Sequence, residues 1–216
     1  MNTLKFKAYT IIKGKIIHCD YPPNSLLNEE RLKDELKISR TPIRDALSRL
    51  EQESLIQILP RRGIMVRGIS PDEVEQVYDM RLLIEPYALK KHGQKIDRKV
   101  LADMETFFSL KSDELPNEII HKKDDEFHDL YIKASGNIYI IEAYKFVYNQ
   151  NFRLRILSGN LGEDRMKNSQ KEHLEIVKWC LKGNWEKASE LLTSHLLKSR
   201  EASYNSISNL QVLLRR

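Results

Sequence analysis

The chain has 216 residues and carries 36 Lys and Arg against 31 Asp and Glu, a formal net charge of +5. Residues 1–70 hold 13 of these basic residues and 8 of the acidic ones, and the other residues hold 23 of each, so the whole surplus lies in the first third. Cys19 and Cys180 are too few and too far apart for a disulfide framework, and no segment approaches 18 uncharged apolar residues, which excludes a membrane span.

This distribution of charge favours a small basic domain beside a larger neutral one, and hence a module that binds a polyanion. A solvated lysine-rich surface is the alternative interpretation. Four lysines interrupt the apolar residues between positions 1 and 17, which is unlike a secretory signal. We therefore expect a cytoplasmic protein with reduced thiols.

The first expected elements are two helices. Apolar residues at helical spacing between Leu4 and Ile16 predict the first, and the Tyr-Pro-Pro-Asn sequence at residues 21–24 ends it. Asn28 is expected to cap a second helix that runs to about Leu36. Residues 37–40 then form a tight connection, so the next helix completes a helix-turn-helix arrangement.

That next helix, within residues 39–50, carries basic and apolar residues on separate faces. Thr41 is expected to cap it and Pro42 to occupy its first turn. An apolar stripe of helical period consists of Ile43, Ala46, Leu47 and Leu50. Three arginines lie off this stripe, namely Arg40, Arg44 and Arg49. One face is expected to pack and the other to contact DNA.

The pattern then changes to that of a β-hairpin, with extended residues at 55–59 and 64–66 around a turn at 60–63. Gly63 permits a positive backbone φ, and Arg61 and Arg62 are suited to the electronegative minor groove. An ordinary hairpin with two solvated arginines is the alternative. Because the predicted hairpin directly follows a basic helix, we favour its interpretation as a DNA-binding wing.

The segments at residues 28–32, 38–47, 49–51 and 60–66 resemble the winged helix-turn-helix domain of GntR-family bacterial transcription regulators. The resemblance spans residues 5 to 67. It implies that Arg40, Thr41 and Arg44 contact operator DNA and that Gly63 is the glycine of the wing. The family often has a basic residue where this chain has Glu30.

The remaining residues predict an all-α second domain. Ser70, Pro71 and Glu73 combine a capping box with proline at the first helical position, so we place the domains at residues 1–69 and 70–216. Helices are expected from residue 71 onward and at about 98–111, 116–134, 137–158, 165–182 and 184–203. The predicted fold is mainly α, a winged helix-turn-helix followed by a bundle of six or seven helices.

Several histidines of the second domain are candidate metal ligands. Asp124 and His128 are spaced i, i+4, which places both side chains on one face of a helix. Such a pair is also common as a surface ion pair. His173 and His195 lie among aliphatic residues, and each taken singly is more typical of a packed core histidine.

Taken together, the segments at residues 78–85, 124–128, 136–137, 172–173 and 195–196 resemble the FCD ligand-binding domain of FadR-like regulators. The resemblance spans residues 71 to about 205. It implies a divalent metal ion held by four residues, Asp124, His128, His173 and His195. This donor set suits zinc or nickel, and the sequence does not choose between them.

The resemblance further implies a small organic acid as effector, bound by the metal and by Arg81. A guanidinium suits a carboxylate, and an arginine on an apolar helical stripe needs an anionic partner. The alternative is an internal salt bridge from Arg81 to Glu85 or Asp125. Arg153 is a second candidate for the effector site.

These observations predict a homodimeric, metabolite-responsive transcription regulator, a repressor in the family's commoner mode, that binds double-stranded operator DNA and not a membrane. Two other interpretations stay open at this point. One is a DNA-binding protein whose metal-free bundle serves only dimerisation. The other is a metal-dependent hydrolase, for which the chain offers no recognisable motif that supplies a further base.

Overall fold

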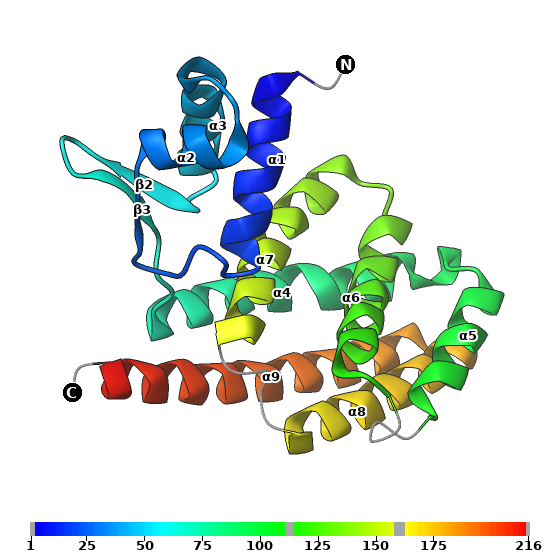
Figure 1. The fold of residues 1–216 in the computed structure, drawn as a ribbon. Helices are drawn as coiled ribbons and strands as arrows, with labels where there is room; N and C mark the ends of the chain where they lie inside the picture. The colour runs from blue at the N-terminus through cyan, green and yellow to red at the C-terminus, as the bar shows by residue number, and fades with distance from the viewer. Residues whose placement is uncertain (1–2, 111–114, 158–162, 215–216) are drawn as a thin grey trace. The chain divides into compact units, whose positions relative to one another are not determined.

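The computed structural model describes residues 3–110, 115–157 and 163–214 of the chain. The chain divides into two compact units, which are considered separately. The first comprises Met1–Ser70 with Phe152–Leu157, and the second comprises Pro71–Asn151 with Ser158–Arg216. Figure 1 shows both, with residues 3–70 of the first unit in blue and cyan.

Three helices build the first unit around one apolar core, as the sequence predicts: α1 (Leu4–Ile17), α2 (Glu29–Leu36) and α3 (Arg40–Gln52). The fully buried side chains of Ile12, Leu32 and Ile43 join the three helices in that core. Asn28 caps α2 as expected, because its side chain accepts a hydrogen bond from the amide of Arg31 at 2.7 Å.

The predicted cap of α3 is wrong. The helix begins at Arg40, after Ser39 with its extended backbone, so Thr41 lies inside the first turn and does not cap it. Pro42 is still accommodated, because the first four amides of a helix have no partner within the helix. The expected apolar face is confirmed, since Ile43, Ala46, Leu47 and Leu50 are all buried.

A small antiparallel sheet completes the first unit. Strands β2 (Ile56–Leu59) and β3 (Gly63–Val66) form the expected hairpin, and β1 (Leu26–Leu27), which the sequence analysis did not foresee, pairs with the other edge of β3. Gly63 has φ of +107°, and a Cβ there would lie 2.8 Å from the carbonyl oxygen of Leu27. Both the backbone angle and this close approach require glycine.

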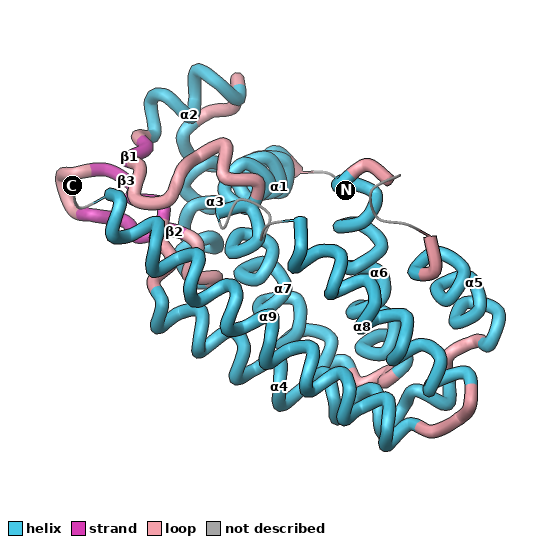
Figure 2. Tube along the Cα trace, turned by 90° about the horizontal axis from the view of Figure 1, so that it is seen from below, coloured by secondary structure: helices cyan, strands magenta, loops and turns pink. Residues whose placement is uncertain are grey.

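The second unit is helical throughout the residues that are described, which confirms the expected all-α class. Its elements are α4 (Pro71–His92), a short 3-10 helix η1 (Gly93–Lys95), α5 (Arg98–Phe108), α6 (Asn117–Ala134), α7 (Ile138–Leu157), α8 (Glu163–Leu181) and α9 (Trp185–Leu214), although the last six residues of α7, Phe152–Leu157, group with the first unit. Figures 1 and 2 both show α4 lying alongside α9.

Two expected boundaries differ from the structure. Helix α5 ends at Phe108 and not near residue 111, and α9 continues to Leu214, well past residue 203. Residues 111 and 158, the expected ends of two helices, lie outside the described residues. Among the helices that are described, none is long and apolar enough to cross a membrane.

Candidate metal centre and nucleic-acid interface

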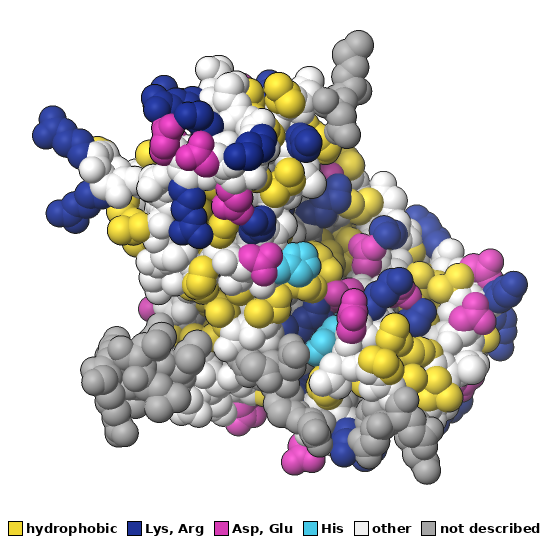
Figure 3. Space-filling model, viewed as in Figure 1, with side chains coloured by type: hydrophobic (Ala, Val, Ile, Leu, Met, Phe, Trp, Pro, Cys, Tyr) yellow, Lys and Arg dark blue, Asp and Glu magenta, His cyan; other side chains and the backbone are white. Residues whose placement is uncertain are grey.

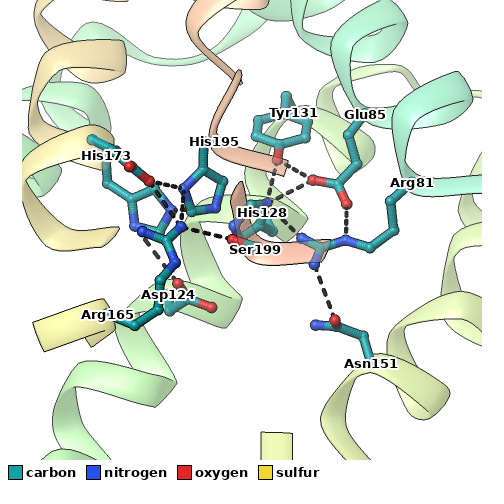
Figure 4. A network of polar contacts seen from close by, with 11 residues as sticks. Arg81, Glu85, Asp124, His128, Tyr131, Asn151, Arg165, His173, His195 and Ser199 are labelled. Carbon is teal, nitrogen blue, oxygen red and sulfur yellow. Dashed lines mark hydrogen bonds and ion pairs between the residues drawn. The ribbon is translucent and has the colours of Figure 1, made fainter. Parts of the chain in front are cut away.

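Three imidazoles from three different helices converge inside the second unit. His128 on α6, His173 on α8 and His195 on α9 each offer a ring nitrogen, and these nitrogens all lie within 4.8 Å of one another (Figure 4). All three side chains are buried, with at most 3% of each residue exposed. The sequence prediction placed these histidines together, and the fold does so.

The spacing of two of these nitrogens fits a shared ion. The Nε2 atoms of His173 and His195 are 3.2 Å apart. Two nitrogens bound to one zinc ion at about 2.1 Å are about 3.0 Å apart at a right angle and about 3.4 Å apart at the tetrahedral angle. The two rings therefore need little movement to bind a transition ion together.

Carboxylates hold two of the rings in the orientation that a metal site requires. Nδ1 of His128 lies 2.6 Å from Glu85 Oε2, and Nδ1 of His195 lies 2.8 Å from Glu172 Oε2. When the Nδ1–H donates to a carboxylate, the lone pair is on Nε2, which is free to bind an ion. The hydroxyl of Tyr131 also donates to Glu85, at 2.6 Å.

The electrostatic environment keeps His173 and His195 in their metal-binding form. Burial lowers the pKa of His173 well below its usual value and lowers that of His195 to about 4. Burial would raise the pKa of Glu172, but hydrogen bonds from His195 and Arg165 hold it well below the usual range. Neutral imidazoles beside ionised carboxylates are the states that bind divalent cations.

Asp124, the fourth expected ligand, lies beside the cluster. Its Oδ1 lies 3.6 Å from Nδ1 of His173, whereas the other ring nitrogen of His173, Nε2, faces His195. Asp124 is therefore placed to orient His173, and a role as direct ligand stays a prediction.

Arg81 lies on α4 and is buried, with only 4% of the residue exposed. It forms a salt bridge to Glu85, one of the two internal partners that the sequence analysis considered. Its Nε donates to Oε1 of Glu85 at 2.5 Å, and its Nη1 donates to Oδ1 of Asn151 at 3.0 Å. Burial would raise the pKa of Glu85, but the charge of Arg81 lowers it to about 2. The same Glu85 bonds to His128, so one carboxylate joins α4 to the histidine cluster.

Arg165 also belongs to the site, although sequence reasoning did not select it. Its guanidinium donates to Glu172 at 2.9 Å and to the hydroxyl of Ser199 at 2.8 Å. Arg165 and Glu172 lie seven residues apart on α8, and the packing of α8 against α9 brings Ser199 to them. Arg153 groups with the first unit and donates to the carbonyl of Arg67, so its effector role stays a prediction.

The arginines expected to contact DNA lie on the exposed face of the first unit. The side chains of Arg40 and Arg44 are 59% and 65% exposed, and Thr41 and Arg61 are exposed as well. Figure 3 shows Lys and Arg side chains projecting at the tip of the β2–β3 hairpin. Arg62 is exposed at the same tip, next to Gly63.

Arg49, at the other end of α3, has neighbours within its own unit. Its guanidinium carbon lies 3.9 Å from the centroid of the Tyr9 ring, and its Nε donates to Glu53 at 3.3 Å. A cation over an aromatic face stabilises the packing of α1 against α3. A DNA contact from Arg49 stays a prediction.

Comparison with known proteins supports this division of the chain. Residues 4–66 match the bacterial regulatory proteins of the gntR family, and residues 76–198 match the FCD domain. The transcriptional repressor GlaR of Escherichia coli is 23% identical over 214 residues, which cover 91% of this chain and 94% of GlaR.

Solved structures with the same fold include a GntR-type transcriptional regulator from Rhodococcus sp. RHA1. It has a TM-score of 0.77 at 19% identity, and the match covers 93% of this chain and 97% of the Rhodococcus chain. The Zn²⁺-bound FCD domain of TM0439 has a TM-score of 0.51 at 25% identity, covering 66% of this chain and 97% of that domain. A metal-free form of that domain has a TM-score of 0.56 at 24% identity, and the match covers 67% of this chain and 99% of that domain.

The winged helix-turn-helix and the helical bundle together define a DNA-binding transcription regulator, not an enzyme. The chain belongs to the FCD-containing branch of the GntR family.

Proposed function

We propose that this regulator is a cytoplasmic, metabolite-responsive repressor whose second domain, residues 70–216, binds a divalent metal ion and a small carboxylate effector. The convergence of three buried imidazoles, two of them oriented by carboxylates, is the observation that carries the proposal. Zinc or nickel suits this donor set. The Zn²⁺-bound FCD domain of TM0439 supports zinc as the first ion to test.

The effector is proposed to bind between the metal and Arg81. A bound divalent ion with an open position attracts a carboxylate. Arg81 Nη1 donates to the neutral amide oxygen of Asn151, a partner that an anionic oxygen would replace favourably. Arg153 is retained as a second proposed contact.

The first domain, residues 1–69, is proposed to read the operator. Arg40, Thr41 and Arg44 at the amino-terminal end of α3 are proposed to contact bases and phosphates in the major groove, with Arg49 as a further contact. Arg61, Arg62 and Gly63 are proposed to contact the minor groove. All of these except Gly63 have exposed side chains.

A homodimer would present two recognition helices to a palindromic operator. Exposed apolar residues on α4 support dimerisation through the second domain, because Met80, Leu83 and Tyr87 are 40%, 70% and 47% exposed at helical spacing. Exposed apolar surface of this kind is a common feature of subunit interfaces.

Elemental analysis of gently purified protein tests the metal site. We expect about one zinc or nickel ion per chain, and less than about 0.2 in the variant His173→Ala, because a site built from several protein ligands retains its ion. A wild-type content below about 0.2 would favour the alternative function, a regulator with a metal-free dimerisation bundle.

Recovery of bound genomic fragments tests the regulatory part. The purified protein should retain a small set of fragments, and one class of small carboxylates should release them. Release that persists unchanged in Arg81→Ala would contradict the proposed effector contact.

A further inference from the structure

Glu30, in the first turn of α2, lies among basic side chains on the face that carries the proposed DNA contacts. Its Oε2 is 2.5 Å from Nη2 of Arg40, and its Oε1 is 2.6 Å from Nζ of Lys33. The Glu30 side chain is 51% exposed. Hydrogen bonds from Lys33 and then Arg40 lower the pKa of Glu30, so this carboxylate is charged at neutral pH.

The neighbouring Glu29 makes a different contact. Both of its carboxylate oxygens lie 2.9 Å from Nε of Arg44. The Nε atom is the inner nitrogen of the guanidinium, so this contact does not itself use the two outer Nη groups. Those outer groups form the edge with which an arginine recognises guanine or phosphate.

The two acidic residues thus contact different nitrogens of their arginines. Glu30 occupies an outer nitrogen of Arg40, whereas Glu29 holds the inner nitrogen of Arg44. A carboxylate and a phosphate present similar pairs of anionic oxygens to a guanidinium, so only one of them takes a given edge at a time. Both ion pairs are exposed, and exposed pairs exchange at little cost.

We infer that Glu30 competes with DNA phosphates for Arg40 and thereby weakens binding to DNA of any sequence, whereas Glu29 positions Arg44 without blocking its reading edge. This inference rests on the proposed role of α3 in DNA binding.

Such a competitor lowers the affinity for DNA of every sequence by about the same factor. Phosphate contacts dominate the affinity for random sequences, and base contacts add to it only at the operator. Removing one phosphate contact therefore reduces the fraction of protein that is bound at the many non-specific sites of a genome. Glu30 is on this account a determinant of the overall affinity for DNA, and it leaves the ratio between operator and random DNA unchanged.

The test compares Glu30→Gln with Glu29→Gln in the full-length protein, with a short random-sequence duplex as the probe. Gaining one phosphate contact raises affinity about fivefold at 0.15 M salt and steepens the logarithmic salt dependence by about 0.9. We expect this change in Glu30→Gln on random and operator DNA alike. We expect Glu29→Gln to bind random DNA no more tightly than the wild type and the operator more weakly.

The variant Glu190→Gln, which removes an exposed carboxylate paired with Lys187 on α9, controls for net charge alone. If Glu29→Gln or Glu190→Gln gains as much affinity for DNA as Glu30→Gln does, the inference is overturned, because the effect is then one of total charge. An unchanged affinity of Glu30→Gln would overturn it as well.

Failure of the proposed function gives a different result. If Arg40→Ala and Arg44→Ala both bind DNA as the wild type does, then α3 is not the DNA-binding element. If these two variants lose binding while Glu30→Gln is unchanged, the inference about Glu30 fails alone. Thermal unfolding followed by circular dichroism checks that every variant is folded.

Discussion

The same two residue types, arginine and glutamate, are paired in both units, but in opposite surroundings. Arg44 and Glu29 are 65% and 33% exposed, whereas Arg81 and Glu85 are 5% and 0% exposed. In water the attraction of such a pair nearly balances its hydration, so the arginine is available to a competing anion. Away from water the partners depend on each other, and the pair becomes a fixed part of the structure.

Removal of Glu85 should have the largest effect. Glu85→Ala leaves the charge of Arg81 buried without its partner, and we expect a loss of about 3–5 kcal/mol in the free energy of unfolding. Urea denaturation of the metal-free protein measures it. The double variant Arg81→Met, Glu85→Leu removes both charges and should regain much of this loss. A loss below about 1 kcal/mol in Glu85→Ala would mean that the two pairs do not differ as described.

Acidification should weaken the second unit next. His195 has a pKa of about 4 in the folded chain because it is buried, and an ordinary value near 6.5 when unfolded. Between these values the unfolded chain binds more protons, so stability is greatest above pH 6.5 and falls as the pH is lowered. From pH 6.5 to 5 the loss is about 1.6 kcal/mol for His195 alone, and His173 acts in the same direction.

Denaturant titrations in a chelating buffer measure this loss before ordinary carboxylates begin to titrate. A free energy of unfolding that stays constant from pH 7 to pH 5 would contradict the burial of neutral imidazoles.

Arg44→Ala should affect DNA binding and leave the fold intact. We expect operator affinity to fall by about 5- to 150-fold, the usual range for an arginine that reads a base. Fluorescence anisotropy with labelled operator measures it. Lys145→Ala, which removes an exposed cation paired with Glu142, is the matched control and should bind as the wild type does. A similar loss in both variants would indicate a general effect of charge.

The smallest effect is expected for an exposed ion pair that is not proposed to contact DNA or the effector. Glu190→Gln should change the free energy of unfolding by less than about 0.5 kcal/mol, because Glu190 and Lys187 are 58% and 46% exposed. A loss above about 1 kcal/mol, measured by the same urea titrations, would show that exposure alone does not separate the two kinds of pair.

Local signals in the sequence predicted much of the fold. The cap at Asn28, the apolar stripe of α3 and the hairpin around Gly63 are each determined by neighbouring residues, and the structure has all three. Strand β1 was missed because two leucines carry no alternation, and only pairing with β3 makes them a strand. The extension of α9 was missed because the serines and asparagines near residues 203–209 suggest a helix end.

The candidate metal centre was predictable only in part. The histidines were found through a resemblance to a family, and their convergence follows from the packing of separate helices. Glu172 is adjacent to His173 in sequence but bonds to His195, because successive residues of a helix point in different directions. Arg165 shows the same limitation, since its partner Ser199 lies 34 residues further along the chain.

Helix α4 connects the end of the DNA-binding domain to Arg81. It begins at Pro71, directly after the DNA-binding domain, and Arg81 lies ten residues along it, about 15 Å at the rise of an α-helix. The stretch from Asp72 to Glu85 contains neither glycine nor proline, and Pro86 follows it in the sequence. This stretch therefore behaves as a rigid rod, and an axial displacement of Arg81 moves Pro71 by nearly the same amount.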